Sequence, residues 1–274
     1  MAKLEAGIAL LSERYAVRHT PRLLEREGFL AGSDRARVEE LNLALASDTA
    51  AIYCARGGYG AMRILSRIDA SLIERTSKPL IGFSDITALH ALWQNLGVGS
   101  IHGPTLTQLP TLPLEDQLAL YDLLEGQLPA PMSGTSIGSR TVAAGPLFGG
   151  NLELVSRLVG TPYAFSLAGA VLLLEEVGER PYSVDRSVTH LLLAGALDRL
   201  SAIVVGDLTR CTEPDGSGPS ADEVIAERLG GLGIPVVVGL PIGHGTRNRS
   251  VGIGMQVSVD GTTGLVTPLA PATG

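Results

Sequence analysis

A hydroxyl, two carboxylates and an imidazole occur in this sequence at places where a folded chain can bring them together. The hydroxyl belongs to Ser84, in the run Gly82-Phe83-Ser84-Asp85, where an apolar stretch turns directly into a helical pattern. Open α/β folds bind ligands at the carboxyl edge of their strands, and a helix N-terminus there offers free N–H groups. The run matches the nucleophile elbow G-x-S-x-G in part, because Ile86 replaces the second glycine. The alternative is that Ser84 or Asp85 only caps the following helix.

A glycine-rich turn, Arg56-Gly57-Gly58-Tyr59-Gly60, follows the apolar run AIYCA. Adjacent glycines let backbone N–H groups approach a ligand closely, as in phosphate nests and oxyanion holes. The turn matches neither G-x-G-x-x-G nor a Walker loop. It can therefore supply backbone donors, or it is an ordinary tight turn.

The carboxylates are Glu175 and Glu176, at the end of the run VLLLEE. Because side chains alternate along a strand, we expect one to point inward, where it could orient a histidine, and the other outward. The alternative is that both are solvated at a strand end. Among the histidines, His244 lies between two glycines after the run PVVVGL, where it could face a cleft. His102, in SIHGP, lies at a strand-to-loop edge and is ambiguous.

Each feature is weak alone, but together they provide a nucleophile, an acid and a base at strand ends. In a serine hydrolase, the base takes the serine proton, and the acid fixes its tautomer and stabilises the imidazolium. Ser84, His244 and a glutamate meet these requirements, in the chain order Ser, Glu, His. The Gly57-Gly58 turn and the Asp85 N–H could donate hydrogen bonds to an oxyanion.

The elements that must position these groups alternate between strands and helices. Short apolar runs ending at glycine-containing turns predict strands at 51–55, 79–83, 170–177, 202–206 and 235–240. Helical spacing predicts helices at 34–46, with Ser33 as N-cap, and at 60–68, 70–75, 86–96, 187–197 and 221–229. Residues 127–150 keep no period and predict a linker, and residues 251–266 predict a terminal antiparallel hairpin. Strand-helix alternation indicates a parallel sheet covered by helices.

Composition excludes several classes of partner. The 274 residues carry 21 basic and 28 acidic side chains, a net charge of −7, with 4% aromatics, so we expect neither nucleic acid nor anionic membrane as a partner. Cys54 and Cys211 lie far apart, with no Cys or His at metal-ligand spacing, so we expect no metal and a reducing compartment. The first residues lack the features of a signal peptide, and no run approaches the ~18 apolar residues of a membrane span.

Six motifs, in order along the chain, resemble those of the LD-carboxypeptidases. They read ARGGYGAMRIL, IGFSDITALH, HGP, FGGNLELVSRLVGTPY, LLLEEVGERPYSVDR and GLPIGHG. One motif alone would be weak evidence, but six in order make the resemblance specific, and it covers nearly the whole chain. The LD-carboxypeptidases are cytoplasmic serine peptidases that remove the terminal D-alanine from murein tetrapeptide. The family also includes the microcin C self-immunity peptidases.

The resemblance implies an α/β fold, with a parallel-sheet N-terminal domain, a smaller mixed α/β C-terminal domain and the active site between them. We place the domains at residues 1–128 and 146–274, with a linker at 129–145. Family members use no metal or cofactor, and homodimers are usual among them. The implied substrate is a murein peptide, cleaved in the cytoplasm during cell-wall recycling.

Carried onto matching positions, the resemblance makes Ser84 the nucleophile, Glu175 the triad acid and His244 the base. The backbone of the RGGYG turn, at Gly57 and Gly58, and that of Asp85 would form the oxyanion hole. A carboxypeptidase must also bind the terminal carboxylate of its substrate. The candidates for substrate binding are Arg56, Asn151 and Arg186, although Arg186 is as readily a structural ion-pair partner.

The sequence departs from the family at its start. Members open with an apolar strand and a Pro-Ser type loop ahead of the helix that here reads KLEAGIALLSER, whereas this chain begins at that helix. We therefore expect the N-terminal sheet to lack its first strand, either because the strand is absent or because the start codon is assigned too late. A lost strand would expose a sheet edge and remove a loop that lines the cleft.

Two other functions stay open at this point. A microcin-type enzyme would cleave a peptide-nucleotide antibiotic and needs an aromatic side chain to stack the nucleobase. Trp93, the one tryptophan, lies in a helical run with a core-facing pattern, so we see no such platform. The other function is a non-catalytic α/β module that binds a small molecule. Generic α/β-hydrolase activity is a weaker possibility, because the second elbow glycine is missing.

Overall fold

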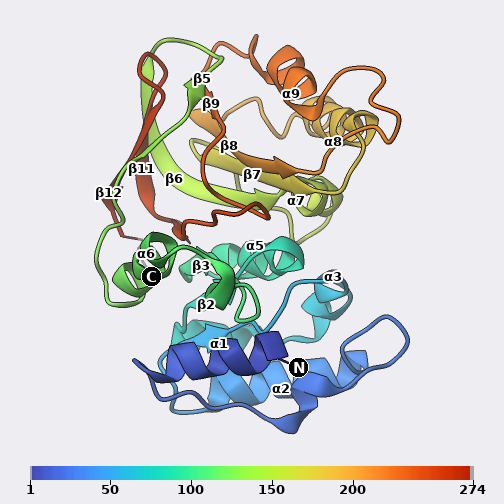
Figure 1. Ribbon diagram of the computed structural model, residues 1–274, viewed down its shortest axis with the longest axis vertical. Coiled ribbons are helices and arrows are strands. Elements are labelled where there is room, and N and C mark those ends of the chain that lie inside the picture. The colour runs from blue at the N-terminus through green and yellow to red at the C-terminus, as the bar shows by residue number, and fades with distance from the viewer. Residues whose placement is uncertain (1, 272–274) are drawn as a thin grey trace.

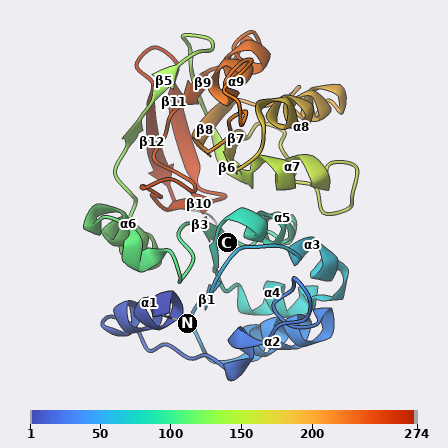
Figure 2. The same ribbon diagram turned by 45° about the vertical axis from the view of Figure 1, so that its right-hand side comes forward.

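Two β-sheets, one mainly from each half of the chain, form the framework of the molecule (Figure 1). The computed structural model describes residues 2–271. The N-terminal half lies at the bottom of Figures 1 and 2 and the C-terminal half at the top. No helix among the described residues is long and apolar enough to cross a membrane.

The N-terminal sheet has four strands in the order β1-β2-β3-β10. The strands β1 (Ile52–Tyr53), β2 (Leu80–Gly82) and β3 (Ser100–His102) are parallel. Helices alternate with them: α1 (Ala2–Ser12), α2 (Asp34–Ala46), α3 (Ala61–Ile64), α4 (Ala70–Thr76), α5 (Thr87–Asn95) and α6 (Leu114–Leu124). Short 3-10 helices add η1 (Pro21–Leu24), η2 (Leu65–Arg67), η3 (Ser84–Ile86) and η4 (Leu109–Thr111).

The C-terminal sheet has eight strands in the order β4-β12-β11-β6-β7-β8-β9-β5. Its centre is parallel and consists of β6 (Val142–Asn151), β7 (Val171–Val177), β8 (Ala202–Thr209) and β9 (Val236–Val238). Antiparallel strands flank that centre: β4 (Met132–Ser133), β5 (Thr135–Ser136), β11 (Gln256–Asp260) and β12 (Leu265–Ala270). The helices are α7 (Leu152–Leu158), α8 (Pro181–Leu193) and α9 (Ala221–Leu229). The α/β class, with a parallel sheet and a mixed sheet, is confirmed.

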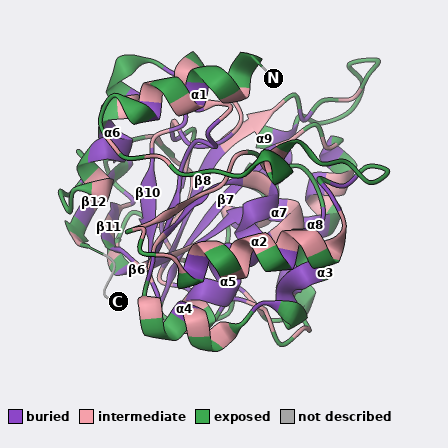
Figure 3. Cartoon of the chain, turned by 90° about the horizontal axis from the view of Figure 1, so that it is seen from below, coloured by how far each residue is buried: buried purple, intermediate pink, exposed green. Residues whose placement is uncertain are grey.

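Local sequence accounts for several of these elements. The Ser33 hydroxyl accepts a hydrogen bond from the Ala36 N–H at 3.1 Å and caps α2, as predicted. The strand β7 is buried from Val171 to Glu176, because both faces of a central parallel strand are covered. In Figure 3 the central strands β7 and β8 are accordingly mostly buried, and many of the exposed residues lie on the outer helices and loops.

Three predicted elements were wrong in part. The helix predicted at 187–197 runs from Pro181 to Leu193, because proline favours the first helical position and Gly195, with φ +67°, lies beyond its end. The helix predicted at 60–68 is α for one turn only, at Ala61–Ile64, and continues as 3-10. The hairpin predicted at 251–266 consists of β11 and β12 instead, further along the chain.

The strand β10 (Val251–Ile253), which falls within that predicted hairpin, crosses to the other sheet. It pairs antiparallel with β3, so that Val251 lies opposite His102. A segment of the C-terminal half thus completes the N-terminal sheet. The segment expected as a linker, 129–145, contains β4, β5 and the start of β6. The domain boundaries themselves stay a prediction.

Candidate active site

Ser84 lies at a strained turn between β2 and α5. Its φ is +66°, a left-handed conformation that a non-glycine residue rarely adopts, whereas Phe83 before it is extended. The chain leaves β2 at Gly82 and enters the 3-10 turn Ser84–Ile86, which leads directly into α5. This is the strand-turn-helix context that a nucleophile elbow requires.

The glycine turn lies against the Ser84 side chain. A Cβ added to Gly57 would be 2.8 Å from the Ser84 Cβ and 3.1 Å from its Oγ, so only glycine fits this contact. Gly58 has a φ of +104°, which also favours glycine. Among residues 2–271, no hydrogen bond uses the N–H of Gly57 or Gly58. The backbone of Gly57 therefore lies against the serine, and the role of the two glycine N–H groups as oxyanion donors stays a prediction.

The Asp85 carboxylate joins the elbow to the glycine turn. Its Oδ2 accepts a hydrogen bond from the Ala61 N–H at 2.8 Å, at the start of α3, which follows directly on the turn. Burial raises the pKa of Asp85. The alternative, in which Asp85 caps the following helix, is therefore wrong: its side chain accepts from the first residue of α3, and α5 has no side-chain cap. Its N–H stays a predicted oxyanion donor.

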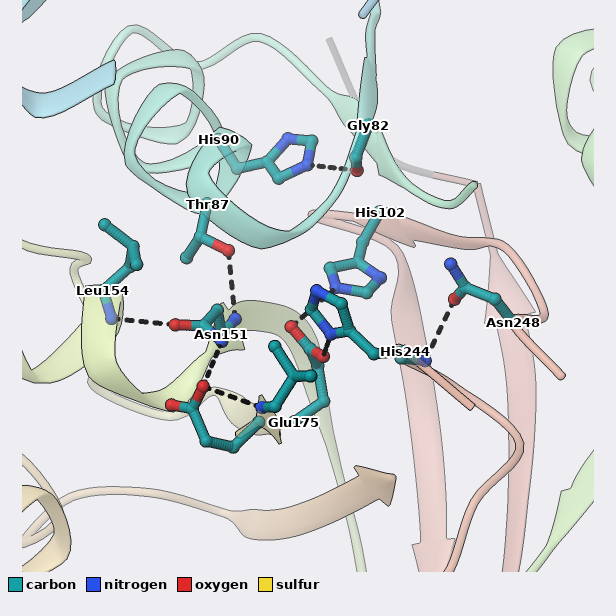
Figure 4. Close-up of polar contacts among 12 residues, drawn as sticks. Gly82, Thr87, His90, His102, Asn151, Leu154, Glu175, His244 and Asn248 are labelled. Carbon is teal, nitrogen blue, oxygen red and sulfur yellow. Dashed lines mark hydrogen bonds and ion pairs between the residues drawn. The ribbon is translucent and has the colours of Figure 1, made fainter. Parts of the chain in front are cut away.

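Glu175 and His244 form a partly buried hydrogen bond. The His244 Nδ1 lies 2.7 Å from the Glu175 Oε2, and Glu175 is fully buried (Figure 4). Burial alone would raise the pKa of Glu175, but the neighbouring imidazoles of His102 and His244 outweigh it and lower the pKa. With Nδ1–H donated to a carboxylate, Nε2 is the nitrogen free to accept a proton.

The ring of Phe83 packs against His244, with 4.5 Å between the ring centroids. Because Phe83 precedes Ser84, this contact brings the His244 loop to the elbow. Ser84 and His244 share no hydrogen bond within the described part of the chain. Catalytic hydrogen bonds are often long in free enzymes and tighten when substrate binds, so this geometry agrees with a triad that closes on its substrate.

A polar network from α6 holds the His244 loop. The Asn248 side chain accepts a hydrogen bond from the Gly243 N–H at 3.0 Å, and the backbone N–H of Asn248 donates to the Asp116 carboxylate at 3.1 Å. Arg247 makes a bidentate pair with Asp116, at 2.8 and 2.7 Å. Sequence reasoning missed these residues. In the sequence, Asp116 looks like an ordinary acidic residue at the start of a helix. The signal that could have pointed to this network is the polar run RNRS after the predicted base.

Glu176 is also buried, which the sequence did not predict. Its side chain lies on the face of β7 opposite to Glu175, but α7 covers that face. The carboxylate accepts hydrogen bonds from the Asn151 side chain and from the N–H groups of Glu153 and Val177, each at 2.8 Å. The expectation that one glutamate points outward to solvent was therefore wrong, as was a solvated strand end for both.

The three predicted substrate-binding residues occupy different environments. Asn151 is buried, and both polar ends of its side chain are used, because it caps α7 at Leu154 and donates to Glu176. Arg56 is exposed next to the glycine turn. Arg186 is exposed on α8 and lies over the Tyr182 ring at 5.1 Å. Neither arginine forms an ion pair among residues 2–271, so the structural ion pair considered for Arg186 is not formed there.

Two protein-family models match the chain. The model of the LD-carboxypeptidase N-terminal domain matches residues 1–103, and that of the C-terminal domain matches residues 144–259. A murein tetrapeptide carboxypeptidase of Pseudomonas aeruginosa is 33% identical, over 94% of this chain and 88% of its own. The chain belongs to the LD-carboxypeptidase family. The membership predicted from the six motifs is confirmed.

Solved structures of other proteins share the fold of this LD-carboxypeptidase. A muramoyltetrapeptide carboxypeptidase from Oxalobacter formigenes matches with a TM-score of 0.87, at 23% identity, over 98% of this chain and 95% of its own. The microcin C7 self-immunity protein in complex with aspartyl sulfamoyl adenosine matches with a TM-score of 0.86, at 21% identity, over 99% and 92%. These similarities support the fold, and the family membership supports peptidase activity. In the described residues, no group of three or more His, Cys, Asp or Glu side chains could hold a metal ion.

Proposed function

We propose that this LD-carboxypeptidase is a serine peptidase that removes the terminal D-alanine from murein tetrapeptide. The observation that carries the proposal is the 2.7 Å hydrogen bond between buried Glu175 and His244, whose ring packs on Phe83 beside the strained Ser84. The murein tetrapeptide carboxypeptidase of P. aeruginosa, at 33% identity, supports the substrate class.

In the first step, the Ser84 hydroxyl attacks the carbonyl carbon of the bond between the L-centre and D-alanine. The His244 Nε2 takes the hydroxyl proton as the C–O bond forms. Glu175, which accepts a hydrogen bond from the His244 Nδ1, keeps the imidazole in the required tautomer and stabilises the imidazolium. The N–H groups of Gly57, Gly58 and Asp85 donate to the oxyanion, which they can do without breaking an existing bond at the two glycines.

In the second step, the tetrahedral intermediate collapses. The C–N bond breaks, and His244 gives its proton to the amine of the departing D-alanine, which leaves an acyl-enzyme on Ser84. Water then attacks the ester with His244 as base, and the shortened peptide is released with a new carboxylate. Arg56, exposed beside the glycine turn, is the candidate partner for the terminal carboxylate of D-alanine.

The setting of the reaction is part of the proposal. We place the enzyme in the cytoplasm, acting on murein peptides during cell-wall recycling, as a homodimer and without a cofactor. The free thiols of Cys54 and Cys211 agree with a reducing compartment. Fractionation of cells followed by sedimentation of the enzyme tests the compartment and the oligomeric state.

Mass spectrometry of disaccharide-tetrapeptide incubated with the enzyme tests the activity. We expect the wild type to release D-alanine and Ser84→Ala to lose the activity by about three orders of magnitude or more. Ser71→Ala, on the exposed side of α4, serves as the matched control and keeps full activity. The proposal is wrong if the wild type releases no D-alanine. The serine mechanism is wrong if Ser84→Ala releases it equally well, which would leave a non-catalytic role for the triad.

The microcin-type alternative gains no support from the aromatic residues at the core. Trp93 is fully buried, and its indole N–H donates to the Lys78 carbonyl at 2.9 Å, so it cannot stack a nucleobase. Incubation with an aminoacyl-sulfamoyl nucleoside, in parallel with murein tetrapeptide, separates the two substrates. We expect hydrolysis of the murein peptide to be the faster reaction.

A further inference from the structure

The buried histidine His102 lies near the Glu175 carboxylate, next to the oxygen that His244 does not bind. It is fully buried at the end of β3, and neither of its ring nitrogens has a hydrogen-bond partner among residues 2–271. The Glu175 Oε1 is likewise buried and unpartnered, and it lies 3.9 Å from the His102 Nε2 (Figure 4). A buried polar atom without a partner is costly, so two that face each other at this distance require an explanation.

Apart from Glu175, the groups placed around the His102 ring form no hydrogen bond with it. The Phe83 ring stands edge-on to it, with 5.8 Å between centroids, and Gly150 packs against the imidazole, since a Cβ there would be 3.3 Å from the His102 Cδ2. The nearby His90 uses both of its own nitrogens, on the Gly82 carbonyl at 2.9 Å and the Ser100 hydroxyl at 2.8 Å. A shift of about 1 Å would close the gap to Glu175 to a charge-assisted hydrogen bond of roughly 2.9 Å.

We infer that His102 is a positioning residue, which holds the Glu175 carboxylate through Oε1 while His244 uses Oε2. The Glu175 carboxylate would then accept hydrogen bonds from two imidazoles, which would prevent its side chain from rotating. The direction in which the Glu175 carboxylate points sets the orientation of the His244 ring. His102 therefore acts on the reaction through Glu175 and His244. This inference rests on the proposed serine mechanism and adds a residue to it.

The charged and titratable groups around Glu175 fix the direction of the expected effect. His244 and His102 face its two oxygens, while the carboxylates of Glu176, behind it on β7, and Asp207, on β8, add negative charge nearby. His90 stays neutral beside His102, because burial lowers its pKa to about 3. Removing the His102 donor from Oε1 leaves the negative charge of Glu175 stabilised by one hydrogen bond fewer. The Glu175–His244 pair then binds its proton more tightly, whichever of the two carries it.

Two substitutions of nearly equal size separate this donor role from packing. In His102→Gln the side-chain amide can still donate to Glu175, whereas in His102→Met it cannot. We expect the Met variant to lower kcat roughly 10–100-fold with little change in KM. The acid limb of its kcat/KM profile should move up by about one pH unit, and the Gln variant should lie close to the wild type in that limb.

The titration of His244 by NMR is the second measurement, and it needs no substrate. We expect the apparent pKa of His244 to be higher in His102→Met than in the wild type and to be restored in His102→Gln. The matched control is His90→Met, which removes a buried neutral imidazole that does not face Glu175 and should leave this titration unchanged. Should the Met variant of His102 not fold, His102→Leu takes its place.

Equal His244 titration in the Gln and Met variants would overturn the inference, because it would reduce His102 to a packing residue. A wild type that releases no D-alanine would defeat the proposed function instead. The NMR titration would still decide in that case whether His102 acts on the Glu175–His244 pair.

Discussion

Glu176 carries a carboxylate buried at the N-terminus of α7, and its titration affects stability near neutral pH. Burial raises its pKa to about 7, although three hydrogen-bond donors and the helix end favour the charged form. A carboxyl with a raised pKa binds more protons in the folded state than in the unfolded state. Its contribution to stability is therefore present at low pH and is lost as the pH rises through about 7.

We predict that the free energy of unfolding depends less on pH in Glu176→Gln than in the wild type. Between pH 4.5 and about 7 the wild type should lose about 3 kcal/mol relative to the variant. Urea denaturation at a series of pH values measures this difference in slope, whatever the absolute stability of the variant. The control is Glu227→Gln, an exposed position on α9, which should keep the wild-type slope. Parallel slopes for the wild type and Glu176→Gln would contradict the prediction.

Among individual residues, the sequence predicted those that stand at a recognisable local feature, such as the end of a strand or the start of a helix. Ser84 follows an apolar run at a helix start, His244 lies between glycines after a strand, and Glu175 ends a strand. It did not predict that Glu176 is buried, because the cover on that face of β7 comes from α7, which was not predicted. Nor could it assign His102, whose significance depends on a distance to Glu175 across the two halves of the chain.

The loop that carries His244 takes its shape from another element, α6. Asp116 on that helix is fully buried and binds Arg247 in a bidentate pair as well as the Asn248 N–H. Asn248 in turn holds the Gly243 N–H, one residue before the imidazole proposed as the catalytic base. The Glu175 carboxylate can orient His244 only if this loop keeps its position. The network is therefore expected to matter for kcat more than for substrate binding.

We predict that Asp116→Asn lowers kcat at least tenfold and the free energy of unfolding by about 2 kcal/mol, a value discounted because Arg247 is partly exposed. The control is Glu125→Gln, which breaks the similar bidentate pair with Arg14 on the exposed surface of the same half. It should change neither quantity appreciably. Steady-state kinetics and urea denaturation of both variants provide the test. An Asp116→Asn enzyme with the wild-type kcat would show that the loop keeps its shape without the network.

Elements with a clear period or cap were predictable, and those defined by tertiary pairing were not. The helix α2 was found at its predicted bounds, with Ser33 as its cap. The strand β10 could not be assigned to its sheet, because the alternation of its residues fits either a hairpin or a pairing with β3. Short strands such as β4 and β5 carry little period of their own and depend on the neighbours that they join.

The two halves share a large hydrophobic cluster. A single cluster of buried side chains contains Leu80 and Trp93 from the N-terminal half together with Leu172 and Ile203 from the C-terminal sheet. The Thr87 hydroxyl of α5 accepts a hydrogen bond from the Asn151 N–H at 3.0 Å. The crossing of β10 into the N-terminal sheet adds a backbone link between the halves. Because the proposed triad takes Ser84 from one half and Glu175 and His244 from the other, this continuity holds the three residues near one another.

We predict that the whole molecule unfolds in one cooperative transition, despite its two sheets. Trp93 is the single tryptophan, so its fluorescence reports on the N-terminal half, while far-UV circular dichroism reports on both. Val204→Ala removes buried side-chain volume in β8, in a separate apolar cluster of the C-terminal sheet, at a cost of about 2 kcal/mol. If the halves are coupled, the Trp93 transition shifts to lower urea together with the dichroism. A Trp93 transition that stays at its wild-type midpoint would mean that the halves unfold separately, and that the triad is lost as soon as the first half unfolds.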